Sequence, residues 1–179
     1  AVGGIVGFVA GSGSEDLRIN DSSFEGSINA PSASGVGGIV GTVMTSSGSV
    51  NIDSSSAKLK KLAGFSNVGG LIGDAAISSG ASIERSYVWI DINGDQNGAG
   101  EDISITSGTN VGAFIGNATS VGNGGASIKE SYIHTKNAIV NTNFAAPVGG
   151  TGAGTVSTSN AASINATQLS GGSYTAIPN

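Results

Sequence analysis

The residues best suited to chemistry stand in one polar stretch, DINGDQNGAGED, at 91–102. Oxygen-bearing side chains recur at alternate positions and a late carboxylate follows, which is typical of loops that wrap Ca²⁺. The stretch therefore predicts a calcium site formed by Asp91, Asn93, Asp95, Asn97 and Asp102. The glycine usual at the sixth position is Gln96 here. The alternative is a long polar insertion with Asn-Gly turns at 93–94 and 97–98.

A second candidate site is a pair of aromatic-containing segments. Alternate side chains of a strand share a face, so Tyr87 and Trp89 point outward if Val88 points inward. The same argument groups Tyr132 with His134, one repeat later. Exposed flat rings in a row suit contact with a sugar or a protein, and we take these four residues as a candidate ligand-binding surface. The alternative is a ladder that only packs repeat on repeat, or that lies under the 91–102 insertion.

Catalytic constellations are weakly supported. Glu84 and Arg85 have Lys129 and Glu130 at the equivalent positions of a later repeat, and this alternation of sign favours a solvated ion-pair ladder. His134 is the single histidine, and no Ser-His-Asp order stands out among the many serines. We therefore predict no catalytic residues and no enzyme activity.

The elements that must position these residues belong to a repeat. A glycine-rich motif begins at Val2, Val36, Val68, Val111 and Val148, at spacings of 34, 32, 43 and 37. A second motif follows, with a central isoleucine and, three positions later, a serine or threonine. The isoleucines are Ile19, Ile52, Ile83, Ile128 and Ile164, and the hydroxyl residues are Ser22, Ser55, Ser86, Ser131 and Thr167.

The period inside each repeat is two, which indicates strands, and the step of three from isoleucine to serine indicates a corner. We predict an all-β parallel β-solenoid of about five coils with three short strands per coil. The isoleucines would form one buried ladder. The hydroxyls would form another, bonded to each other or to corner backbone groups. The whole of 1–179 would be a single repeat domain interrupted by the 91–102 insertion.

Glycine in the first motif predicts corners with positive φ and strands that another layer approaches closely. The motif is also apolar at successive positions. The side chains on one face of this strand form a stripe that a single coil would not bury. Its members are Ile5, Ile39, Leu71 and Phe114. Either a neighbouring segment of the same protein or another copy of the chain would cover this stripe, and we expect another copy, within a fibre.

Composition excludes several classes of protein. The 179 residues include 31 glycines and no cysteine, so neither a disulfide framework nor a thiolate metal site is present. Net charge is −5, and the only basic cluster is Lys58, Lys60 and Lys61, which argues against nucleic acid as a partner. No apolar run approaches the roughly 20 residues needed for membrane insertion. The chain opens inside a repeat, as a fragment of a longer protein would.

The pattern GG[IL][VI]G followed by SIxxSY, best matched at 68–87, resembles the GLUG repeat of large bacterial surface proteins such as adhesins and haemagglutinin-like exoproteins. The resemblance implies a non-enzymatic structural or adhesive segment, located outside the cell or on its surface, that forms a stiff rod. The partners expected are other copies or flanking repeats, and a host or prey surface glycan or protein. The alternative is a carbohydrate-active β-helix, either a polysaccharide lyase or a tailspike-type hydrolase.

Overall fold

The computed structural model describes residues 1–14, 16–77, 79–90, 110–112, 114–120, 126–135, 148–151, 156–159 and 162–165. In these ranges the protein is all-β, with no helix, and all strand pairs are parallel. No helix able to cross a membrane is found in this part of the chain. This architecture is consistent with the predicted solenoid.

Four parallel sheets organise the described residues, and we label them A to D. Sheet A contains β1 (Val2–Gly3), β5 (Ser34–Gly37), β9 (Ser66–Gly69) and β13 (Val111–Gly112). Sheet B contains β2 (Val6–Gly11), β6 (Val40–Thr45), β10 (Ile72–Ile77), β14 (Ile115–Ser120) and β17 (Val148–Thr151).

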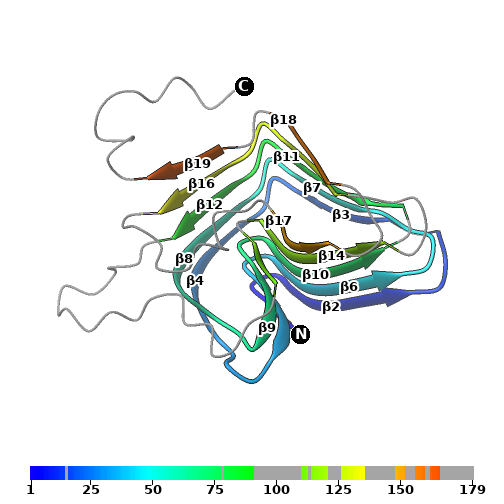
Figure 1. Ribbon diagram of the computed structural model, residues 1–179, viewed down its shortest axis with the longest axis horizontal. Helices are drawn as coiled ribbons and strands as arrows, with labels where there is room; N and C mark the ends of the chain where they lie inside the picture. The colour runs from blue at the N-terminus through cyan, green and yellow to red at the C-terminus, as the bar shows by residue number, and fades with distance from the viewer. Residues whose placement is uncertain are drawn as a thin grey trace.

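The other two sheets carry the second motif. Sheet C contains β3 (Leu17–Asn20), β7 (Val50–Asp53), β11 (Ala81–Glu84), β15 (Ala126–Lys129) and β18 (Val156–Ser159). Sheet D contains β4 (Ser23–Asn29), β8 (Ser56–Ala63), β12 (Tyr87–Ile90), β16 (Tyr132–Thr135) and β19 (Ala162–Asn165). In Figure 1 the strands of sheets B, C and D lie side by side, from the blue strands β2, β3 and β4 of the first repeat to the strands of later repeats.

Each of the first four repeats thus supplies four strands, and the prediction of three was wrong. The glycine-rich strand is divided by a bend at its isoleucine. The N–H groups of Ile5 and Val6 both donate to the carbonyl of Ile39, each at 3.0 Å. Ile39 and Val40 share the Leu71 carbonyl in the same way. Two consecutive amides directed at one oxygen interrupt the ladder, which ends one strand and begins the next.

The same bend explains a second correction, to the apolar stripe. Ile39 and Leu71 are 0% exposed and Phe114 is 1% exposed within this one chain, and only Ile5, in the first repeat, is 45% exposed. Their neighbours, such as Val40, are buried too. At a bend, consecutive side chains can both point to the interior. Ile39, Leu71 and Phe114 therefore need no second copy to cover them.

The isoleucine ladder is confirmed over four repeats. Ile19, Ile52, Ile83 and Ile128 pair in register and are all buried. The prediction that Ile164 continues the ladder was wrong, because Ile128 pairs with Thr158 and Ile164 lies beside His134 in sheet D. β18 places β-branched Val156 and Thr158 at alternate positions, and they take the places of Ala126 and Ile128.

Glycines in the first motif let sheets A and B touch through their backbones. A Cβ placed on Gly73 would lie 2.2 Å from the nitrogen of Val36 and 2.5 Å from the carbonyl carbon of Gly35. The predicted close approach is therefore confirmed. The prediction of glycine at corners with positive φ was largely wrong. In the described part of the chain, Gly35 and Gly80 are the glycines with positive φ, whereas most such positions hold other residues.

Candidate functional site

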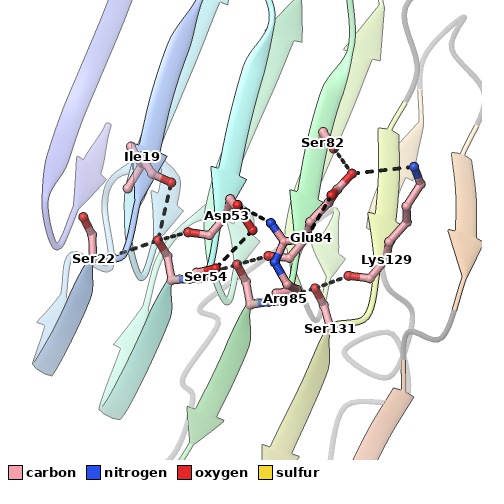
Figure 2. Close-up of polar contacts among 11 residues, drawn as sticks. Ile19, Ser22, Asp53, Ser54, Ser82, Glu84, Arg85, Lys129 and Ser131 are labelled. Carbon is pink, nitrogen blue, oxygen red and sulfur yellow. Dashed lines mark hydrogen bonds and ion pairs between the residues drawn. The ribbon is translucent and has the colours of Figure 1, made fainter. Parts of the chain in front are cut away.

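The corner between sheets C and D is built on a serine ladder, part of which Figure 2 shows. Each serine hydroxyl donates to the carbonyl two residues earlier, as Ser86 Oγ does to Glu84 O at 2.7 Å. The hydroxyls of Ser55, Ser86 and Ser131 also accept the N–H of the serine one repeat earlier: Ser22 N to Ser55 Oγ is 3.2 Å, and Ser86 N to Ser131 Oγ is 3.1 Å. Ser55, Ser86 and Ser131 are buried. Of the two predicted partners, the corner backbone groups are the ones used. Thr167 lies outside the described residues.

The residue before each serine adopts a left-handed conformation. Asp21, Ser54, Arg85 and Glu130 have φ between 46° and 50°. This region is uncommon for residues other than glycine. Here the serine hydroxyl and its carbonyl acceptor bracket the left-handed residue and hold the turn. The corner therefore turns the chain from sheet C to sheet D with an ordinary side chain at its tip.

Those tip residues lie beside an ion-pair ladder on the surface. Arg85 pairs with Asp53 of the preceding repeat and lies 3.6 Å from Glu84 (Figure 2). Lys129 Nζ lies 3.6 Å from Glu84 Oε1, as the stacking of Glu84 and Lys129 predicted. The side chains are 27% to 54% exposed, so each pair contributes at most about 1 kcal/mol. The charges mark a solvated surface.

Sheet D carries the aromatic candidates, on the neighbouring strands β12 and β16. Tyr87 pairs in register with Tyr132, and Trp89 with His134, as the repeat alignment predicted. Tyr87 is 37% exposed, Trp89 is partly exposed and Val88 between them is buried. The alternation predicted for this strand is therefore confirmed. Ligand binding by these four residues stays a prediction.

One repeat earlier, the same face becomes polar. Ser56 pairs with Tyr87, and Lys58 pairs with Trp89. Lys58 Nζ lies 3.1 Å from Glu25 Oε1, and both side chains are about half exposed. Ser56 is buried, so the groups that this face presents beside the aromatic rings are the charged ones of Lys58 and Glu25.

A polar network that the sequence did not predict lies between sheets A and B. Asn67 Nδ2 donates to Asp74 Oδ2, and Asn117 Nδ2 donates to Asp74 Oδ1, both at 2.9 Å. Asn110 Nδ2 donates to Asn67 Oδ1 at 2.9 Å. Asp74 Oδ2 therefore joins sheet B to sheet A, whereas Asp74 Oδ1 joins the neighbouring strands β10 and β14 within sheet B. The available signal was position: Asn67 and Asn110 directly precede the glycine-rich motif, and Asp74 and Asn117 directly follow it.

A second unpredicted contact joins the first two repeats. Asp16 Oδ1 accepts the hydroxyl of Ser49 at 2.7 Å and its backbone N–H at 2.9 Å. Arg18 donates to the other carboxylate oxygen at 3.1 Å. These hydrogen bonds, led by that of the Ser49 hydroxyl, lower the pKa of Asp16 from 3.8 to about 2.

The predicted calcium ligands Asp91, Asn93, Asp95, Asn97 and Asp102 lie outside the described residues, so that site stays a prediction. The described ranges themselves hold no group of three or more acidic, histidine or cysteine side chains placed to bind a metal. No protein-family model, no curated protein and no solved structure matches this chain.

Proposed function

We propose that this chain is a β-solenoid of about five coils, built from GLUG-type repeats, that serves as a non-enzymatic structural and adhesive segment of a bacterial extracellular or cell-surface protein. One observation carries the proposal. Successive repeats add strands, in register, to the same four parallel sheets, while the faces turned outward keep exposed rings and charges.

The repeat supports a stiff rod for a physical reason. In the described ranges each coil is joined to the coils next to it by backbone hydrogen bonds and by the buried isoleucine and serine ladders. One coil advances the stack by about 4.8 Å. A segment built this way gains length by adding repeats, and it carries each outward residue along the rod at a fixed spacing.

The adhesive part of the proposal belongs to the outer face of sheet D. Tyr87 and Trp89 offer rings, Lys58 offers a charged group one strand away, and its ion-pair partner Glu25 lies two strands away. A sugar ring stacks on an aromatic ring and directs its hydroxyls to nearby polar groups. A surface glycan is therefore the ligand that this face fits best, with a surface protein as the other partner class.

A glycan array probed with the fluorescently labelled chain tests the adhesive role. We expect binding to at least one glycan class, weakened about tenfold or more by Tyr87→Ala, because a tenfold loss corresponds to removing about 1.4 kcal/mol of contact. Phe65→Ala is the matched control, since Phe65 is an exposed ring (49%) outside the strands of sheet D. Absence of glycan binding, or equal binding by Tyr87→Ala and the wild-type chain, would contradict the proposal.

A further inference from the structure

The outer edge of the first repeat, formed by β1 to β4, presents residues whose equivalents in later repeats are covered. Ile5 is 45% exposed where Ile39 and Leu71 are fully buried, and Val2 is partly exposed where Val36 is buried. Exposure of this kind accompanies any end of a stack and does not identify a partner. Two further residues, Gly7 and Ser22, indicate what kind of partner fits this edge.

Gly7 occupies a position where later repeats need glycine, because a Cβ there would collide with the backbone of the preceding repeat. A Cβ on Gly41 would lie 2.4 Å from Gly7 O and 2.6 Å from Val2 N. A Cβ on Gly73 would meet Val36, and one on Gly116 would meet Val68, at 2.2 Å and 2.5 Å from their nitrogens. All these atoms belong to the backbone of the preceding repeat. Glycine is therefore needed at this position because the backbone of the preceding repeat packs directly against it.

Gly7 itself has no such neighbour. A Cβ placed there would reach only the carbonyl oxygen of Ala1, at 4.0 Å, which is an ordinary contact. Its φ is not positive either. Within the described residues, nothing therefore requires glycine at position 7. The equivalent glycines each have the backbone of another repeat packed against them, and the same packing would explain glycine at position 7.

Ser22 likewise lacks a neighbour that its equivalents have, in this case a hydrogen-bond donor. The hydroxyls of Ser55 and Ser131 each accept an N–H from the preceding repeat. Ser22 Oγ donates to Asn20 O at 2.8 Å, as its equivalents do to theirs. Among the described residues no N–H donates to Ser22 Oγ, whereas its equivalents accept theirs from the preceding repeat.

We propose that this edge receives one more coil of the same glycine-rich repeat, joined directly ahead of Val2. The Val-Gly strand of that coil would lie on Gly7, and its corner N–H would donate to Ser22 Oγ. The proposal continues an interface that the chain already forms between its own repeats. It rests on the register of the repeats and not on glycan binding, so either proposal can fail without the other.

An extended chain tests this directly. A copy of residues 34–67 replaces Ala1, so that the copied Val36 falls 32 residues ahead of Val2, the spacing from Ser34 to Ser66 and from Val36 to Val68. We expect the amides of β1 to β4 to exchange more slowly with deuterium in the extended chain. We also expect Gly7→Ala to lower its melting temperature by about 4 °C or more while leaving the original chain within about 1 °C.

Gly11→Ala is the control, because a Cβ on Gly11 meets nothing within 4 Å and its register partner Thr45 already has one. An extended Gly7→Ala chain that fails to fold while extended Gly11→Ala folds would support the proposal more strongly. Equal effects of Gly7→Ala in both chains, or unchanged exchange in β1 to β4, would overturn it. So would concentration-dependent association of the original chain that Gly7→Ala abolishes, since a second copy would then occupy the edge.

Discussion

At the scale of single residues, Asp16 shows how one repeat sets the ionisation of a group in another. The Ser49 hydroxyl, the Ser49 amide and then Arg18 donate to its carboxylate, and all three favour the charged form. The folded pKa of about 2 lies below the ordinary 3.8. The resulting contribution to stability is therefore present above about pH 4, and it is lost as the pH falls through about 2.

We predict that the carboxyl carbon of Asp16, followed by NMR, titrates with a midpoint near 2. Ser49→Ala should move that midpoint upward, because it removes the largest cause of the shift and leaves the backbone hydrogen bond. Ser46→Ala is the control, since Ser46 also bonds to the preceding repeat, at Ser12 O, without touching Asp16. A wild-type midpoint at the ordinary value would show that the contact to Ser49 does not form in solution.

The residues that sequence reasoning found and missed differ in a physical way. Ile83 and Ser86 were predictable because the same residue recurs at the same place in each of the first four repeats, and stacked repeats bring equivalent positions together. Asp16 with Ser49, and Asn67 with Asp74, join unlike positions. Such contacts depend on how near two turns or two sheets lie in space. The periodicity of the sequence does not predict that distance.

At the scale of elements, the contact between sheets A and B depends on glycine. The atoms that crowd Gly73 belong to the backbone, namely those of Val36, Gly35 and Gly41 at 2.2 to 2.6 Å from a Cβ. A backbone cannot rotate away as a side chain can. A methyl group here would force the two sheets apart and disturb the buried positions on both sides of the bend.

Gly73→Ala should therefore lower the free energy of unfolding by about 3 kcal/mol, at the upper end of overpacking in a close-packed interior. Urea unfolding followed by circular dichroism measures the loss. Gly11→Ala, on the same sheet but in open space, should change stability by less than about 0.5 kcal/mol. Equal stabilities of the two variants would mean that the sheets do not touch where the structure places them.

The strands themselves were predictable from alternation, but their number was not. Alternation identified β11 and β12 on either side of the corner at Ser86. It could not reveal that the glycine-rich segment is two strands, because the bend arises when Ile39 and Val40 direct their amides to one carbonyl. The consecutive apolar residues Ile39 and Val40 fit either a bend or one strand covered on both faces, so the order of apolar residues did not decide the number of strands.

At the scale of the whole molecule, the repeats stack so that each contacts its neighbours. The register of strand pairing changes at the fifth repeat, where the sequence departs from the motif. The fifth repeat lacks the apolar pair of the first motif, and Val148 pairs with Ile115 of sheet B, not with Val111. Alignment by sequence alone placed Ile164 over Ile128, whereas the sheet places Thr158 there. Strands pair by shape and hydrogen bonding, so a degenerate repeat is free to shift along its neighbour.

The central claim is that successive repeats lie in parallel register, with Ile83 between Ile52 and Ile128. A methyl NOESY spectrum of the chain labelled at isoleucine δ1 tests it most directly, with assignments from single Ile→Val variants. Strands about 4.8 Å apart bring neighbouring methyl groups within reach of the experiment. The account predicts cross-peaks from Ile83 to both Ile52 and Ile128. An Ile83 methyl with a cross-peak to neither would contradict it.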